Sequence, residues 1–285
     1  EVRHIIQDIA NLAQAAADGG GVSMDEIESI GIGIPGIAND QTGIVEYAVN
    51  LYWHDVPVRE MLGGLTGKQI RIDNDANSAA YGEYIAGAAK NSHSALAITL
   101  GTGIGGGLII DGSIYEGYNF GAMEVGHMVI RKGGRPCPCG RLGCFERYTS
   151  ALGLAITTRD FMADHPESMI WDMVGGDINK VEGRTAFDAM DLGDAVGAAI
   201  VSRYIDDLAC GVTSLINIFQ PEIVCVGGGI SGRGESLIAP LREIVAKEVY
   251  TRESAKNTRI VRAVLGNDAG IIGAANLYRI KRQGC

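Results

Sequence analysis

The sequence predicts an α/β fold, on three observations. Apolar runs of strand length alternate with stretches of helical periodicity along the chain. Clusters of glycine follow several of the apolar runs, as expected for tight turns and for close backbone approach to a ligand. The chain of 285 residues is 46% hydrophobic and 20% charged, the composition of a globular protein with one large domain or two moderate ones.

In the first third of the chain, apolar spacing, glycine and proline define the expected elements. These are a helix from residue 2 that ends at glycines 19–21, a strand over 27–34, a turn-rich stretch through Pro57, a short helix over 58–62, a strand over 69–72 and an alanine-rich helix to about residue 89. Asp73, Asn74 and Asp75 follow the 69–72 strand. They are candidates for a site, because α/β folds place ligands at the carboxyl ends of strands.

The rest of the chain continues the alternation. A strand over 95–100, the cluster Gly101-Thr102-Gly103-Ile104-Gly105-Gly106-Gly107 and a strand over 108–110 predict a hairpin that contains the glycines. There follow a mainly helical region over 150–212, a strand over 222–226 ending at Gly227-Gly228-Gly229, a helix over 235–249, a strand over 260–264 and a helix over 269–278. We expect a smaller domain over 1–93, on which the C-terminal helical segment 269–285 packs, and a larger domain over 94–268.

Bulk properties exclude several classes of protein. The formal net charge of −10 argues against a large nucleic-acid interface, which requires Lys and Arg. No apolar run is long enough to span a bilayer, and the opening residues Glu1-Val2-Arg3-His4 do not resemble a signal peptide. Six cysteines without such a signal suggest a cytoplasmic protein with metal-bound or free thiols.

Three of the cysteines lie within eight residues, in Cys137-Pro138-Cys139-Gly140-Arg141-Leu142-Gly143-Cys144. Zinc prefers four thiolate or imidazole ligands, and His127 is the expected fourth. Four protein ligands leave no open position, so this zinc would be structural. Free thiols and an iron–sulfur cluster are weaker alternatives, because close exposed thiols oxidise and no fourth cysteine is suitably spaced. Cys210 and Cys225 lie in apolar segments and are expected in the core.

Carboxylates flank this cluster. Glu124 and Glu146 would lie near His127 and could accept hydrogen bonds from adjacent hydroxyls of a polyol; on spacing alone, solvated glutamates or pairing with Arg147 are equally supported. Among Asp73, Asn74 and Asp75, a general base for phosphoryl transfer competes with the simpler alternative of an N-cap for the next helix.

Two segments match the dinucleotide pattern G-x-G-x-x-G, at 101–106 and 227–232. The first precedes a strand instead of a helix, and the second lacks a well-placed acidic partner, so a nucleotide-dependent oxidoreductase is a minor hypothesis. Phosphate-binding turns are the preferred interpretation, with the Thr102 hydroxyl beside the backbone amides.

Together these motifs resemble the ROK family of sugar kinases and sugar-responsive repressors. The resemblance rests on Glu124-x-Gly-His127, then Cys137-x-Cys139-Gly-x-x-Gly-Cys144-x-Glu146, with Asn74-Asp75-Ala-Asn77, Gly101-Thr-Gly-x-Gly-Gly and Val226-Gly-Gly-Gly229 in support. It implies a two-domain actin-like ATPase fold, similar to ribonuclease H, with an interdomain cleft. It implies phosphorylation of a hexose, with glucose the leading candidate, by ATP and Mg²⁺.

The resemblance also assigns roles to residues. Asp75 would be the catalytic base. Asn74, Glu124, His127 and Glu146 would bind the sugar. Zinc would be held by His127, Cys137, Cys139 and Cys144, and the nucleotide by Gly101, Thr102, Gly103, Gly228 and Gly229.

Some alternatives stay open at this point. Kinases of this family begin with a strand hairpin carrying an Asp-x-Gly-Gly-Thr motif, and the repressors carry a helix-turn-helix; the sequence from Glu1 contains neither. A sugar-sensing repressor is therefore a second hypothesis. A kinase for N-acetylmannosamine, N-acetylglucosamine or fructose also stays open, because loop shape decides between hexoses. We expect a homodimer or homotetramer.

Overall fold

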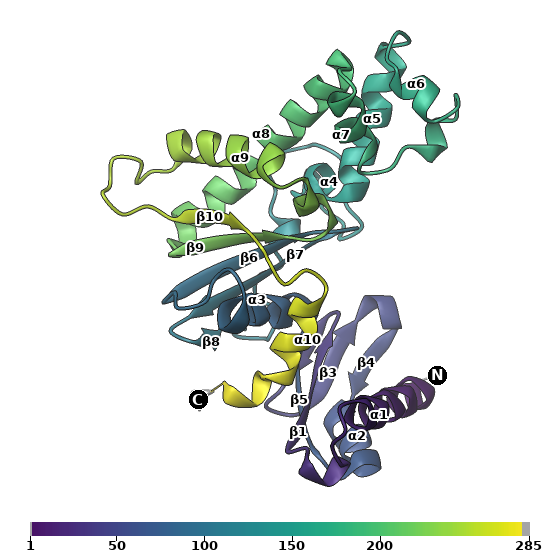
Figure 1. Ribbon diagram of the computed structural model, residues 1–285, viewed down its shortest axis with the longest axis vertical. Helices are drawn as coiled ribbons and strands as arrows, with labels where there is room; N and C mark the ends of the chain where they lie inside the picture. The colour runs from purple at the N-terminus through teal and green to yellow at the C-terminus, as the bar shows by residue number, and fades with distance from the viewer. Residues whose placement is uncertain (1, 281–285) are drawn as a thin grey trace. The chain divides into compact units, whose positions relative to one another are not determined.

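The computed structural model describes residues 2–280, which form two compact units (Figure 1). Unit 1 contains the described residues of Glu1–Ala97, Gly107–Met123 and Val264–Cys285, and unit 2 contains Ile98–Gly106 and Glu124–Ala263. Strands alternate with helices in chain order, so the predicted α/β class is confirmed. The domain boundary predicted between residues 93 and 94 stays a prediction.

Unit 1 contains a parallel strand pair and a small antiparallel sheet. Its elements are α1 (Val2–Gly19), β1 (Ser29–Ile34), β2 (Ile37–Asn39), β3 (Ile44–Ala48), β4 (Trp53–Val56), α2 (Val58–Thr66), β5 (Gln69–Asn74), α3 (Asp75–Ala86), β8 (Ser113–Ile114) and α10 (Asp268–Ala275). β1 runs parallel to β5, with Ile34 opposite Asn74, and within the described residues it has no other strand partner. β2, β3 and β4 form an antiparallel sheet.

The prediction of a turn-rich stretch up to Pro57 was wrong, because β2, β3 and β4 lie there. These strands are only three to five residues long, too short for period-two alternation to emerge from the sequence. Burial of Val45, Ala48 and Trp53 against α1 and α2 stabilises them. Tertiary packing therefore decides a structure that local pattern leaves open.

Helix α10 packs closely on α3 and β1, which lie beside it in Figure 1. A Cβ added at Gly31 of β1 would lie 1.8 Å from the Ala274 carbonyl oxygen, and one at Gly82 of α3 would lie 2.1 Å from that of Ala269. Only glycine permits the backbones of β1 and α3 to approach α10 so closely. This packing holds β1 and α3 in place around the end of β5.

Five strands form one sheet in the order β10-β9-β6-β7-β8, in which β6 and β7 each have residues in both units. The predicted hairpin is confirmed as β6 (Ser94–Leu100) and β7 (Ile104–Ile110), with Gly101-Thr102-Gly103 in its turn. In unit 2, β9 (Ile223–Gly227) is completely buried and runs parallel to β10 (Arg259–Arg262).

The helices of unit 2 cover residues 146 to 248. They are α4 (Glu146–Thr149), α5 (Ala151–Asp164), α6 (Ile170–Met173), α7 (Thr185–Asp191), α8 (Ala195–Phe219) and α9 (Glu235–Glu248), and the short 3-10 helices η3 (Val125–His127) and η5 (Gly229–Arg233) adjoin the candidate site. None of the described helices combines the length and apolarity needed to cross a bilayer.

Two cysteine predictions differ in outcome. Cys225 is buried in β9, as predicted, whereas Cys210 is exposed, so its predicted place in the core was wrong. Cys210 lies on the solvent-exposed face of α8, between the buried Ala209 and Gly211. Because this helix is largely apolar, its sequence does not reveal which face is exposed. Cys285 lies outside the described residues.

Candidate functional site

Four side chains predicted to bind a metal converge in unit 2. The ligand atoms of His127, Cys137, Cys139 and Cys144 all lie within 4.8 Å of one another. Cys137 Sγ is 3.6 Å from His127 Nδ1, and Cys139 Sγ is 3.6 Å from Cys144 Sγ. Tetrahedral zinc with Zn–S bonds of about 2.3 Å separates its sulfur ligands by about 3.8 Å. Donor set and spacing therefore both fit zinc.

Glycine and short backbone pairings give this metal loop its shape. Isolated bridges join Val129 to Cys144 and Pro136 to Leu142. Gly143 has φ of 83°, and a Cβ there would lie 1.6 Å from the Arg131 carbonyl oxygen. Any other residue at position 143 would therefore open the loop and move Cys144.

The thiols differ in how readily they ionise without a metal. Burial raises the pKa of Cys144 to about 12, whereas a hydrogen bond from the backbone N–H of Arg141 lowers the pKa of Cys139. Zinc binds thiolates and displaces the thiol protons. A metal is therefore the natural counter-charge for the buried Cys144 sulfur.

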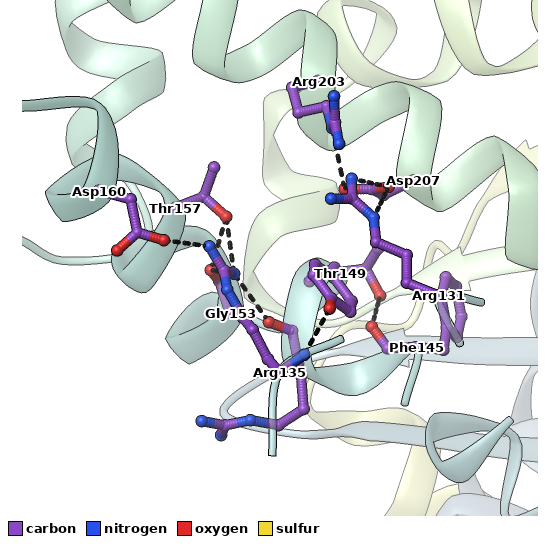
Figure 2. Close-up of polar contacts among 11 residues, drawn as sticks. Arg131, Arg135, Phe145, Thr149, Gly153, Thr157, Asp160, Arg203 and Asp207 are labelled. Atoms are coloured by element: carbon purple, nitrogen blue, oxygen red, sulfur yellow. Dashed lines mark hydrogen bonds and ion pairs between the residues drawn. The ribbon is translucent and has the colours of Figure 1, made fainter. Parts of the chain in front are cut away.

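Two arginines anchor the metal loop to the surrounding helices (Figure 2). Arg131 donates to both carboxylate oxygens of Asp207 on α8, and Arg135 donates to Thr157 and Asp160 on α5. Both guanidinium groups also lie over the ring of Tyr148, at 4.5 and 5.0 Å from its centroid. Sequence reasoning gave no anchoring role to these residues, since their partners lie far away along the chain.

Glu124, His127 and Glu146 lie on segments that adjoin the metal loop. Glu124 precedes η3, His127 ends it, and Glu146 begins α4, which contacts η3. Glu146 Oε2 accepts a hydrogen bond of 2.9 Å from the backbone N–H of Ile104. The alternative of an ion pair between Glu146 and Arg147 is not found among the described residues. Its place is taken by this bond to the β6–β7 turn.

A cavity of about 680 Å³ in unit 2 is lined by both glycine clusters. Gly101, Thr102 and Gly229 line it, whereas Gly103 and Gly228 do not. Gly228 instead lets two segments of the chain lie close together, because a Cβ there would lie 2.5 Å from the Leu100 carbonyl oxygen. Two glycine segments that are more than a hundred residues apart in the sequence thus expose backbone groups to the same cavity.

Sequence reasoning missed the wall of this cavity on α7 and η5. Arg233 lies over the ring of Phe187 at 5.0 Å from its centroid and forms ion pairs with Asp188 and Asp191. These residues belong to no sequence motif. The one available sequence signal was that Arg233 follows the glycine cluster at 227–229. The network fixes the cavity wall.

In unit 1, the three candidates at the junction of β5 and α3 have different partners. Asn74 is the N-cap of α3, since its Oδ1 accepts from the backbone N–H groups of Ala76 and Asn77. Asp73 is buried and accepts from Asn77 Nδ2. Asp75 is exposed, and its one described bond is from the adjacent N–H of Ala76. Capping thus falls to Asn74, and the carboxylate of Asp75 stays available.

Asp75 also lines a cavity of about 560 Å³ in unit 1, formed by residues of α1, β1, α3 and α10. The candidate residues therefore fall into two sets. Asn74 and Asp75 belong to unit 1, and the metal ligands, the glutamates and the glycine clusters belong to unit 2.

Comparisons with a family model, with known proteins and with solved structures agree with the resemblance found in the sequence. The model of the ROK family matches residues 2–281. A glucokinase from Halalkalibacterium halodurans is 36% identical, over 98% of this chain and 84% of its own, and one from Thermotoga maritima is 37% identical, over 96% and 85%. The structure of a ROK family glucokinase from Streptomyces griseus, in complex with glucose and AMPPNP, matches with a TM-score of 0.80 and 31% identity, over 95% of this chain and 87% of its own.

Proposed function

This chain belongs to the ROK family, and from that premise we propose that it phosphorylates glucose with ATP. It is an ATP-dependent sugar kinase, and its fold is the α/β actin-like ATPase fold predicted from the sequence. The identity of about 36% to glucokinases establishes this class of enzyme. Glucose as the substrate, and the role of each residue, are the proposal.

The observation that best supports the proposal is the cluster of four metal-binding side chains, which two glutamates flank in the sequence. Cys137 Sγ lies near Nδ1 of His127, so zinc at this nitrogen leaves Nε2 to donate to a sugar hydroxyl. Glu124 and Glu146 accept from the neighbouring hydroxyls. Zinc is structural here, because His127 and the three cysteines supply four ligands. The Oδ1 atom of Asn74 caps α3 and its Nδ2 donates to the Gly36 carbonyl oxygen, so the second N–H of Nδ2 is the group proposed to donate to the sugar.

Asp75 is the proposed general base, and its exposed carboxylate supports this role. It takes the proton from the primary hydroxyl of the sugar, O6, which attacks the γ-phosphorus in line. Mg²⁺, bound with ATP, supplies charge that offsets the negative phosphates. No other described residue of the β5–α3 junction combines an exposed carboxylate with so few partners.

The nucleotide is proposed to bind at the cavity lined by Gly101, Thr102 and Gly229, with Gly103 and Gly228 shaping its walls. Backbone N–H groups without side chains let phosphate oxygens approach closely. The Arg233 guanidinium covers the buried ring of Phe187 in the wall of this cavity, and the base is proposed to lie against this wall.

A sugar panel with ATP on the full-length protein tests the proposal, with ADP release as the readout. Glucose is expected to give the highest kcat/KM among glucose, fructose, N-acetylglucosamine and N-acetylmannosamine. A higher value for another sugar would replace glucose as the substrate, and absence of sugar-dependent ADP release would favour the sugar-sensing repressor. The homodimer or homotetramer and the cytoplasmic location stay predictions.

A further inference from the structure

The turn between β6 and β7 is held from two sides by segments that follow the metal loop. The N–H of Ile104 donates to Glu146 Oε2 at 2.9 Å, and the N–H of Ala151 donates to the Gly101 carbonyl oxygen at 2.9 Å. Contact at the turn is tight, since a Cβ on Gly103 would lie 2.5 Å from Glu146 Oε2. The shape of this turn therefore depends on where the Glu146 carboxylate lies.

The backbone that carries Glu146 is itself held firmly. Glu146 follows the metal ligand Cys144 and the completely buried Phe145. The Phe145 N–H donates to the Met128 carbonyl oxygen at 2.7 Å, and its ring fills the space over Gly211 of α8, where a Cβ would lie 2.3 Å from the ring. The metal loop and α8 thus fix the start of α4.

The two carboxylate oxygens of Glu146 have different surroundings. Oε2 is committed to the Ile104 N–H, and among the described residues no hydrogen bond to Oε1 is found. The turn that Oε2 holds also lines the cavity proposed for the nucleotide, through Gly101 and Thr102. One carboxylate therefore adjoins both the proposed sugar site and the proposed phosphate turn.

We propose that Glu146 is a positioning residue for the nucleotide as well as a ligand of the sugar. Oε2 holds the β6–β7 turn in the shape that receives the phosphates, and Oε1 accepts from the sugar. The inference rests on the proposed function. Sugar binding restrains the carboxylate and so raises nucleotide affinity, and by reciprocity bound nucleotide raises sugar affinity.

Glu146→Gln and Glu146→Ala separate the two roles. The amide oxygen of glutamine still accepts from the Ile104 N–H, so ADP affinity without sugar is expected to stay within about twofold of wild type. Alanine removes the acceptor, and ADP affinity is expected to fall about tenfold, which corresponds to about 1.4 kcal/mol. Both variants are expected to lose glucose affinity. Calorimetric titration of the full-length, zinc-loaded protein with ADP and with glucose measures all four values.

Glu124→Ala is the comparison variant, because this glutamate has the same proposed sugar role, whereas the Ile104 N–H donates to Glu146. It is expected to lose glucose affinity and keep ADP affinity. Gly103→Ala provides a second variant, since its Cβ displaces the Glu146 carboxylate while Glu146 is retained; it is expected to weaken ADP binding as Glu146→Ala does.

The outcomes distinguish this inference from the proposed function. Equal ADP affinity of wild type and Glu146→Ala, or an equal loss in Glu146→Gln and Glu146→Ala, overturns the positioning role. Failure of the wild-type protein to bind ADP at millimolar concentration overturns the proposed function instead. If Glu146→Ala does not fold, Gly103→Ala decides, and unchanged ADP affinity in that variant rejects the inference.

Discussion

At the scale of single residues, Asp75 and Asn74 divide two tasks that compete at the start of α3. The Asn74 side chain caps the helix through two backbone N–H groups, and Asp75 keeps an exposed carboxylate. From the sequence alone, capping and catalysis are alternatives for the whole triplet Asp73-Asn74-Asp75. The structure assigns the capping to Asn74, which occupies the N-cap position at the end of β5, and the catalytic role of Asp75 stays a proposal.

Asp75→Asn is expected to fold normally, because the exposed side chain has one local hydrogen bond. Turnover should fall by at least about 100-fold, since asparagine cannot accept the proton of the attacking hydroxyl. Glucose affinity should be retained. Steady-state kinetics and calorimetry measure these values, and near-normal kcat would remove Asp75 from the role of base.

Gly143 and Gly140 offer a matched pair in the metal loop. Both have positive φ, but a Cβ at 143 would lie 1.6 Å from the Arg131 carbonyl oxygen, whereas one at 140 meets nothing within 4 Å. Gly143→Ala is therefore expected to lose bound zinc. Gly140→Ala should keep it, with backbone strain costing about 1 kcal/mol. Metal analysis of both purified variants decides, and full zinc content in Gly143→Ala would contradict the steric argument.

At the scale of elements, α8 holds the metal loop in place through Asp207. Its side chain is 11% exposed and binds Arg131 in a bidentate pair, while the exposed Arg203 approaches to 3.8 Å (Figure 2). Removing one partner of a largely buried pair leaves the other charge poorly compensated. The attachment of the loop to α8 thus depends on Arg131 far more than on Arg203.

Asp207→Asn is expected to lower the free energy of unfolding by about 2–3 kcal/mol, because Arg131 loses its charged acceptor. Arg203→Ala, on the exposed side of the same carboxylate, should cost less than about 1 kcal/mol. Urea denaturation of the zinc-loaded proteins measures both changes. Equal losses of unfolding free energy in the two variants would mean that the bidentate pair contributes no more to stability than the contact with Arg203.

Element by element, signals within a short stretch of sequence predicted more of the structure than contacts between distant segments did. The metal loop was predictable because three cysteines within eight residues leave few alternatives, and His127 followed from its closeness in sequence. β2, β3 and β4 were not predictable, because their stability comes from burial of residues such as Trp53 against helices. The cavity wall at Phe187 and Arg233 was equally hidden, since two separate elements build it.

At the scale of the whole molecule, the metal site links folding to binding. Zinc would fix His127 and, through the metal loop, Glu146, so its loss should affect both proposed ligands. The chain has two tryptophans, of which Trp53 is buried in unit 1 and Trp171 lies in unit 2. A Trp171→Phe variant therefore reports on unit 1 alone.

Chelation of zinc is expected to raise the Kd for glucose more than tenfold, since His127 and Glu146 lose their fixed positions. Trp53 fluorescence in the Trp171→Phe variant should stay unchanged, because the four metal ligands found among the described residues all lie in unit 2. Added zinc should restore glucose binding. Retained glucose affinity in the metal-free protein would show that the thiol cluster is unnecessary for the sugar site.

The parallel pair of β1 and β5 has a further consequence for handling the protein. β1 has no second strand partner among the described residues, and a cavity between α1 and α10 adjoins it. A row of unpaired backbone groups is a template for another extended chain. The protein should therefore associate along this edge as its concentration rises, and dilute samples should keep the edge of β1 unpaired during handling.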